Sequence, residues 1–306
     1  MILKQKLPLK VAILIPTLNE AESIKKVINK LHVINPDFVI YVYDNGSTDN
    51  THKIAHNEGA IVIRDDIRGK SRAIQRMFSE IDADLYVTVD GDGQHDLQVL
   101  NQMIETLLEN NLSMVIASRK SITKKHSRAG HASGNRLIRF AINKLFNGKM
   151  KDPLSGYRVM SRPFVKSFPL KSVGFQVETD LTIHALELGL PLIEIESNYF
   201  ERQGNSKLNT FKDGFSILTF ILKCLFDTRP LQLLGSSGLF LISYSLVKFL
   251  PIYQEFLITS QVKQFPTLIV ISSLSISGVL LIISGIILKY LSRMRIENKR
   301  LAYLKI

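Results

Sequence analysis

The sequence contains a single cysteine, Cys224, among its 306 residues. An intrachain disulfide and a cysteine-based zinc cluster are therefore both excluded. Acidic residues are also in deficit, with 27 Asp and Glu against 39 Lys and Arg and a net charge of +12. This balance predicts an anionic partner, such as nucleic acid, anionic lipid or a phosphorylated substrate. A secretory signal is not expected, because the first apolar run, 11–16, has only the length of a strand.

Two common nucleotide-binding fingerprints are also missing. Neither a GxxxxGK[ST] phosphate loop nor a GxGxxG turn follows the first apolar run. Their absence counts against a P-loop protein and against a dinucleotide-binding protein. The phosphates of a ligand would then be neutralised in another way, and a metal ion held by aspartates is one such way.

Charge is absent from one long stretch near the C-terminus. Residues 267–288 contain no charged side chain, and this length can span a hydrocarbon core about 30 Å thick. A second candidate span, 231–250, carries only Lys248, close to its end. Two buried core helices are the alternative. Basic residues flank the pair on both outer sides, so the positive-inside rule predicts a hairpin whose two ends, together with residues 1–210, face the cytosol.

The first 210 residues alternate between strand and helix patterns. Short apolar runs predict strands at 11–16, 38–43, 60–63, 85–90 and 113–118. Helical patterns lie between them at 20–31, 50–58, 70–82 and 97–110. The alternation predicts an α/β fold with a βαβ sheet covered on both faces. Ligands of such sheets gather at the carboxyl ends of the strands, where the turns PTLNE, DNGSTD and DGDGQHD occur, so we expect one shared crevice.

The segment VTVDGDGQHD, residues 87–96, places three aspartates within seven residues. An acidic turn with glycines at positive φ is one interpretation. A divalent-metal site is the other, because crowded carboxylates repel one another unless a cation lies between them. Asp90, Asp92 and Gln94 alternate along the chain, so in an extended turn all three would point the same way. Such oxygen ligands suit Mg²⁺ or Mn²⁺.

A strongly basic segment follows the last predicted strand. Residues 119–151 contain ten Lys and Arg and no acid. Within it, 135–146 places apolar residues on one helical face, with Arg136, Arg139 and Lys144 toward the flanks. Such a helix either exposes its basic face to water or lies on an anionic membrane. The two candidate spans favour the membrane and disfavour a nucleic-acid partner.

Seven motifs occur in order along the chain: IPTLNE, YDNGSTDNT, RGKSRAI, VDGDGQHD, DPLSGYRVMSR, GFQVETDLTIHALELGLPLIEIE and ERQGNSKLNTFKDG. Together they resemble family 2 of the glycosyltransferases, and within it the polyprenyl-phosphate hexosyltransferases. The resemblance covers about residues 10–230 and is specific in the order and spacing of the motifs. It implies a GT-A (nucleotide-diphospho-sugar transferase) fold that binds a nucleotide-diphosphate sugar and transfers its hexose to a polyprenyl phosphate.

With this resemblance the chain divides into three expected parts. Residues 1–210 would form a cytosolic GT-A catalytic domain, and 211–228 an amphipathic helix in the membrane interface. Residues 229–306 would form a membrane domain with spans at about 231–250 and 267–288 and a basic cytosolic tail. We therefore expect a multi-pass protein of the cytoplasmic membrane that contacts the lipid bilayer.

The resemblance also implies roles for individual residues. Many members have Asp where this chain has Asn45, which leaves the donor base, uracil or guanine, open because an Asn both accepts and donates hydrogen bonds. The metal motif, for Mg²⁺ or Mn²⁺, maps onto Asp90, Asp92 and Gln94. The acceptor phosphate would be bound by Arg119, Arg136 and Arg139. The implied donor-binding residues are Pro16, Leu18, Glu20, Asp44, Asn45, Lys70, Asp90, Arg202, Ser206 and Lys207.

Three carboxylates are candidates for a catalytic role: Asp90, Asp152 and Glu178. Capping of a turn is the alternative for Asp152, and capping of a helix N-terminus is the alternative for Glu178. A lipid phosphate is already anionic, so it needs a strong general base less than a hydroxyl acceptor does. Attack opposite the leaving group predicts inversion, from an α-linked donor to a β-linked polyprenyl-phosphate sugar. His184 shows no metal-ligand spacing and is expected to pack.

Two other function classes remain open at this stage. A processive polysaccharide synthase shares the donor site, but its QxxRW acceptor motif needs a tryptophan and this chain has none. A non-catalytic protein that only binds polyprenyl phosphate would not need all three residues of the metal motif. A homo-oligomer, dimer or tetramer, is also expected, because small residues in the first span would permit close helix contact: Gly235, Ser236, Ser237 and Gly238.

Overall fold

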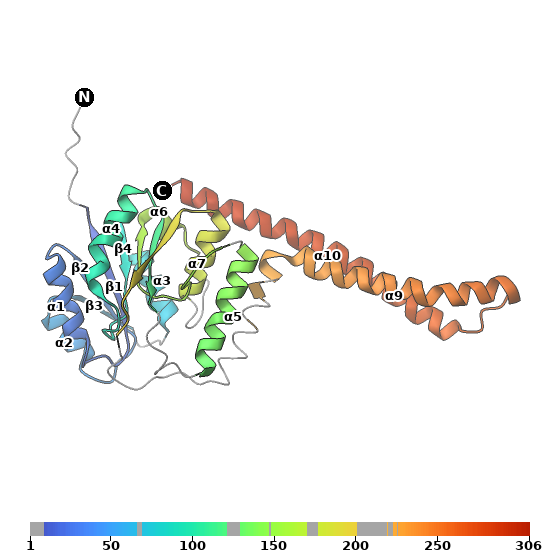
Figure 1. Cartoon of the computed structure of the whole chain (residues 1–306), viewed down its shortest axis with the longest axis horizontal. Helices are drawn as coiled ribbons and strands as arrows, with labels where there is room; N and C mark the ends of the chain where they lie inside the picture. Colours follow the sequence, from blue (N-terminus) through green and yellow to red (C-terminus); the bar gives the residue numbers. More distant parts are fainter. Residues whose placement is uncertain are drawn as a thin grey trace, which may run out of the picture. The chain divides into compact units, whose positions relative to one another are not determined.

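The computed structural model describes residues 9–65, 69–120, 129–146, 148–169, 177–200, 219, 223–224 and 226–306. The chain divides into two compact units (Figure 1). The first, the catalytic unit, comprises Met1–Asp213 together with Lys299–Ile306. The second, the hairpin unit, comprises Gly214–Asn298.

The catalytic unit contains a seven-stranded sheet with the order β3-β2-β1-β4-β6-β5-β7. The five predicted strands are all present, with ends that differ by no more than two residues from the prediction. Two further strands, β6 and β7, were not predicted, and β6 runs antiparallel between β4 and β5. The strands are β1 (Val11–Thr17), β2 (Val39–Asp44), β3 (Ile61–Arg64), β4 (Leu85–Thr88), β5 (Met114–Arg119), β6 (Arg158–Ser161) and β7 (Leu192–Ser197).

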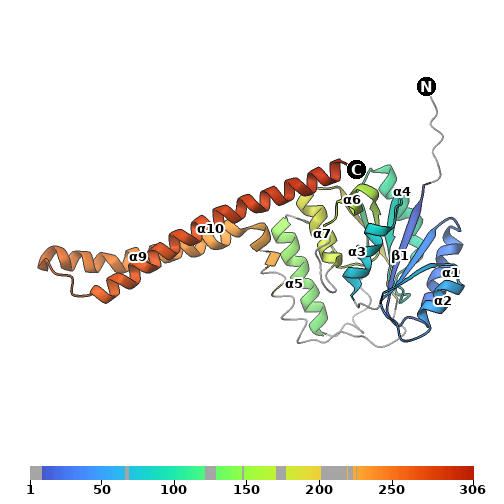
Figure 2. The same ribbon diagram turned by 180° about the vertical axis from the view of Figure 1, so that it is seen from behind.

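Helices cover both faces of this sheet (Figures 1 and 2). One face packs against α1, α2 and α4, and the other against α3, α6 and α7. Strand β1 supplies both cores, because Ile13 and Ile15 point to the first face while Ala12 and Leu14 point to the second. The helices are α1 (Ile24–Ile34), α2 (Thr51–Asn57), α3 (Lys70–Glu80), the 3-10 turn η1 (Leu97–Val99), α4 (Leu100–Glu109), α5 (Ala129–Phe146), α6 (Arg162–Ser167) and α7 (Val177–Leu188).

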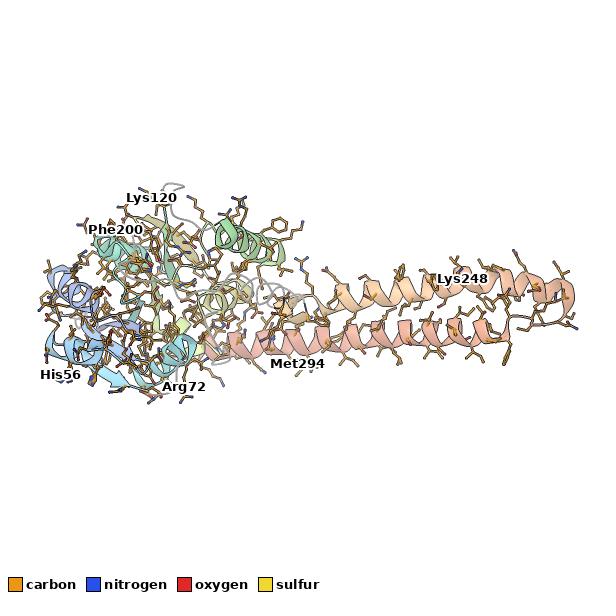
Figure 3. All side chains as sticks on the ribbon, turned by 90° about the horizontal axis from the view of Figure 1, so that it is seen from below. His56, Arg72, Lys120, Phe200, Lys248 and Met294 are labelled. Atoms are coloured by element: carbon orange, nitrogen blue, oxygen red, sulfur yellow. The ribbon has the colours of Figure 1, made fainter. Side chains whose placement is uncertain are left out.

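Two long helices, α9 (Pro230–Thr259) and α10 (Phe265–Leu304), are long and apolar enough to cross a membrane. Figure 3 shows them side by side, with Lys248 on α9. Buried positions recur every seven residues, as in coiled helices, at Gly238, Ser245 and Ile252 of α9 and at Ile271, Gly278 and Gly285 of α10. A Cβ atom on Gly278 would lie 2.7 Å from the carbonyl oxygen of Gly238, so only glycine permits this approach.

The last residues of α10 belong to the catalytic unit. There Lys299 Nζ lies 2.5 Å from Glu187 Oε2 of α7, and the hydroxyl of Tyr303 lies 3.0 Å from that of Ser113. The end of the predicted basic tail, from Lys299 on, is therefore helical and packs within the catalytic unit. Most of the predicted interfacial helix, 211–228, lies outside the described residues.

Candidate active site

The polar turns that follow β1, β2 and β4 lie against one another, as the sequence predicts. The same contacts hold residues 18–23 in a turn, which is why α1 begins at Ile24 and not at the predicted residue 20. Several hydrogen bonds join the turns: among them, Asn19 N donates to Ser47 Oγ (2.9 Å), Glu20 N to Thr51 Oγ1 (2.8 Å) and Ser23 Oγ to the Gly91 carbonyl (2.7 Å).

Asp44 and Asn45 offer buried acceptors at the end of β2. The carboxylate of Asp44 accepts a hydrogen bond from Ser47 N through Oδ1 (2.9 Å). Its other oxygen and Asn45 Oδ1 are buried, and neither accepts a hydrogen bond from the residues that the structure describes. An unpaired buried polar atom costs about 1–3 kcal/mol, so these two oxygens are suited to a ligand's N–H groups. Of the other predicted donor residues, Pro16 is buried, whereas Leu18 and Glu20 are half-buried.

The metal motif follows β4, and Gly91 lets it approach the turn after β1. A Cβ atom on Gly91 would meet the Glu20 carboxylate and would lie 2.9 Å from Thr17 Cγ2, so a larger residue between the two aspartates would displace these side chains. Asp92 Oδ1 accepts a hydrogen bond from Gln94 N (3.1 Å). A cavity of about 320 Å³ is lined in part by Asp90 and Asp92.

The donor set of this motif fits a hard divalent cation. Asp90, Asp92 and Gln94 offer only oxygen ligands, the type preferred by Mg²⁺ and Mn²⁺. Within the described ranges, no three His, Cys, Asp or Glu side chains form a metal-binding group. In this motif the third ligand would be the amide oxygen of Gln94.

Asp90 is paired with a lysine that the sequence placed at the donor site. Lys70 Nζ lies 2.5 Å from Asp90 Oδ1 and 2.6 Å from Glu178 Oε1 (the donor-side cluster). Burial alone would raise the pKa of Asp90, but the Lys70 charge and a hydrogen bond from His95 hold it well below its usual range. Burial would likewise lower the pKa of Lys70, but its two carboxylate partners raise it. One ammonium thus pairs with two of the three candidate catalytic carboxylates.

Arg119, at the end of β5, pairs with the third candidate, Asp152 (the acceptor-side pair). Nε donates to Asp152 Oδ2 (2.6 Å) and Nη2 to Oδ1 (2.8 Å), a bidentate geometry. Burial alone would raise the pKa of Asp152, but the hydrogen bonds and charge of Arg119 hold it below its usual value. Of the other predicted acceptor residues, Arg136 and Arg139 are exposed on α5, and Arg139 donates to the Lys151 carbonyl (3.2 Å), next to Asp152.

The sequence did not predict Arg158, a fully buried side chain of β6. Its guanidinium donates to the carbonyls of Ser155 (2.8 Å) and Pro153 (2.8 Å), so it holds the DPLSG loop that carries Asp152. Burial lowers the pKa of Arg158 to about 10. An arginine in a strand pattern normally predicts a solvated position, so only the structure could reveal this contact.

Tyr199 was also missed, although it contacts two predicted site residues. Its hydroxyl donates to Gln94 Oε1 (2.9 Å), and Arg119 Cζ lies 5.4 Å from the centre of its ring. The remaining predicted donor residues, Arg202, Ser206 and Lys207, lie outside the described residues.

Comparison with known proteins agrees with this architecture. Glycosyl transferase family 2 matches residues 12–168, a little over half of the chain, and the protein belongs to this family. Glycosyltransferase AglJ of Haloferax volcanii is 30% identical over 233 residues, which cover 74% of this chain and 76% of the relative. Dolichol-phosphate mannosyltransferase of Pyrococcus furiosus is 27% identical over 188 residues, which cover 57% and 53%. The resemblance carried by the seven motifs is confirmed, and the protein is a glycosyltransferase.

A solved structure supports the fold. Glucosyl-3-phosphoglycerate synthase from Mycobacterium tuberculosis, crystallised with Mn²⁺, UDP and glucosyl-3-phosphoglycerate, superposes with a TM-score of 0.58 at 21% identity. The match covers 72% of this chain and 79% of that chain. The predicted GT-A fold is therefore confirmed.

Proposed function

We propose that this glycosyltransferase transfers a hexose from a UDP- or GDP-linked sugar to a polyprenyl phosphate at the cytoplasmic face of a membrane. The observation that carries the proposal is the position of Tyr199, which contacts Gln94 of the metal motif and Arg119 of the acceptor-side pair. The expected site for the donor diphosphate and the expected site for the acceptor phosphate are therefore neighbours, and Tyr199 contacts both. Two helices of membrane length and relatives named for dolichyl phosphate support a lipid acceptor.

The hairpin fits this location. Basic residues outside the two apolar helices favour a cytosolic catalytic unit, by the positive-inside rule. We infer that α9 and α10 cross the membrane, so that the acceptor's phosphate reaches the catalytic unit from the bilayer surface.

The donor's base and diphosphate have separate partners in the site. The buried oxygens of Asp44 and Asn45 would accept hydrogen bonds from the base, and Lys70 would add positive charge near the diphosphate. Asp90, Asp92 and Gln94 would hold Mg²⁺ or Mn²⁺, which supplies Lewis-acid stabilisation of the leaving diphosphate when bound. The Mycobacterium tuberculosis enzyme, whose fold is similar, was crystallised with Mn²⁺ and UDP.

In the reaction, an oxygen of the lipid phosphate attacks the anomeric carbon from the face opposite the nucleotide. The new bond joins that oxygen to the anomeric carbon, while the bond from this carbon to the diphosphate breaks and its electron pair leaves with the nucleotide. No proton has to be removed from the acceptor. Asp152 and Glu178, which bind Arg119 and Lys70, therefore act as positioning residues for those cations.

The test uses the purified full chain in detergent with Mn²⁺, undecaprenyl phosphate and a panel of labelled UDP- and GDP-sugars. We expect one donor to give a lipid-linked sugar with inverted configuration. Asp92→Ala should lower transfer at least about a hundredfold, whereas Asp37→Ala, at an exposed position away from the site, should not. Product of retained configuration would contradict the mechanism. Binding of undecaprenyl phosphate without transfer from any donor would favour the non-catalytic alternative.

A further inference from the structure

We propose that Tyr199 is a positioning residue that aligns the metal-binding amide of Gln94 with the acceptor-binding guanidinium of Arg119. This inference rests on the proposed function. Tyr199 follows β7, and its ring face lies under Arg119. Its hydroxyl donates to Gln94 Oε1 and also interacts with the Arg119 guanidinium.

The two contacts of the Gln94 amide fix which of its atoms can face a cation. Oε1 accepts the Tyr199 hydroxyl (2.9 Å), and Nε2 donates to the Phe200 carbonyl (3.1 Å). A free amide can turn over and present its NH₂ group, which cannot bind a metal ion. Because an amide oxygen has two lone pairs, Oε1 can accept the Tyr199 hydrogen and still bind a cation. The Phe200 carbonyl, which can only accept, sets which end of the amide carries the oxygen, and the Tyr199 hydroxyl then holds that oxygen in place for a metal ion.

The contact with Arg119 fixes the plane of the guanidinium. Asp152 engages Nε and Nη2, and the ring of Tyr199 supports the face of the guanidinium at 5.4 Å. Edge and face contacts together leave the guanidinium little freedom to rotate. Nη1, which takes no part in the pair with Asp152, can then meet a phosphate in a fixed direction.

Tyr199 is itself held firmly. It forms an antiparallel bridge with His95, and the two rings lie 5.3 Å apart at 66°. Backbone pairing continues at the next residue, where Phe200 N donates to the Gln94 carbonyl (2.8 Å). A rigid link thus joins the turn after β4 to the segment after β7, although Gln94 and Tyr199 are 105 residues apart.

Two variants separate the contacts. Tyr199→Phe removes the hydroxyl and keeps the ring under Arg119, so Mn²⁺ should bind about two- to tenfold more weakly, while the KM for undecaprenyl phosphate should change less than in Tyr199→Leu. Tyr199→Leu also removes the ring, so that KM should rise about two- to thirtyfold. Mn²⁺ binding is measured by electron paramagnetic resonance in the presence of UDP and, separately, GDP.

Tyr157→Phe is the matched control. Tyr157 packs on the same His95 ring, also at 5.3 Å, and its hydroxyl makes no hydrogen bond to the described part of the chain. We expect this variant to match the wild type in Mn²⁺ affinity and in KM. Equal losses in Tyr157→Phe and Tyr199→Phe, or unchanged Mn²⁺ affinity in Tyr199→Phe, would overturn the inference.

The two arms also separate this inference from the proposed function. The Mn²⁺ measurement needs no acceptor, so it decides the Tyr199–Gln94 contact even if the wild type transfers no sugar to undecaprenyl phosphate. Absence of transfer by the wild type would refute the proposed function alone. Absence of Mn²⁺ binding by the wild type with either nucleotide would overturn the inference.

Discussion

The donor-side cluster and the acceptor-side pair each hold one cation against carboxylate oxygens, but the cations differ. Lys70 is a compact charge shared by Asp90 and Glu178, at 2.5 and 2.6 Å. Arg119 is a planar fork matched to the single carboxylate of Asp152. An ammonium has no preferred plane, whereas a guanidinium directs its hydrogen bonds. Loss of Lys70 should therefore leave two carboxylates without their ammonium, whereas replacement of Arg119 by lysine should mainly remove direction.

The largest effect is expected at Lys70. Lys70→Met leaves Asp90 and Glu178 close together without a cation, which should lower the free energy of unfolding of the catalytic unit by about 2–4 kcal/mol. Chemical unfolding of the purified chain measures the change. It is followed by far-UV circular dichroism, because the chain has no tryptophan whose fluorescence could report unfolding.

A double variant tests the cause. Lys70→Met combined with Glu178→Gln removes one of the two unpaired charges, so it should be more stable than Lys70→Met alone. If the two substitutions are instead additive in their cost, the ammonium does not stabilise the fold by neutralising these carboxylates.

At the acceptor-side pair, Arg119→Lys keeps the positive charge but removes the planar guanidinium and its bidentate hydrogen bonds. We expect kcat/KM for undecaprenyl phosphate to fall about ten- to hundredfold, with Mn²⁺ affinity unchanged. Arg162→Lys is the control, because Arg162 meets a single oxygen of the exposed Asp82. Full activity in Arg119→Lys would show that charge alone suffices at this position.

The comparison also explains what could be predicted from the sequence. Asp90, Asp92 and Gln94 follow a strand at fixed spacing, and Arg119 ends another strand, so pattern and motif order could predict both sides of the candidate site. The pairing of Lys70 with Glu178 links residues 108 positions apart in the chain, and spacing carries no signal for it.

Strand β6 was missed for a related physical reason. Its four residues, Arg158–Ser161, begin with a buried arginine, so they lack the apolar run by which the neighbouring strands were predicted. The stability of Arg158 in the core comes from carbonyl oxygens of the DPLSG loop. Without β6 the sequence predicts a wholly parallel sheet, and the antiparallel step that brings Asp152 beside Arg119 is lost.

Neither charged group of the comparison explains acid sensitivity near neutral pH, because the pKa values of Asp90 and Asp152 both lie below the usual range. His184 does. Burial, with a smaller effect of Lys299, lowers its pKa to about 3. Below pH 6.5 the unfolded chain binds a proton at His184 that the folded chain does not, so stability falls as the pH falls from 6.5 toward 3.

The expected loss at pH 5 is about 2 kcal/mol relative to pH 8. Urea unfolding at several pH values measures it, and His184→Gln should flatten this dependence. His56→Gln, at an exposed position on α2, should leave it unchanged. A steep dependence that persists in His184→Gln would assign the acid sensitivity to another group.

The smallest effect is expected where a contact of the catalytic unit involves no charge. Tyr303→Phe keeps the ring against the core and removes only the hydroxyl that meets Ser113 at 3.0 Å. One neutral hydrogen bond is worth about 1 kcal/mol, so unfolding should become easier by that amount. Tyr290→Phe, exposed on the same helix, should change nothing. Ser113 is almost fully buried. A loss of unfolding free energy well above about 1 kcal/mol would contradict the assignment of this effect to one neutral hydrogen bond.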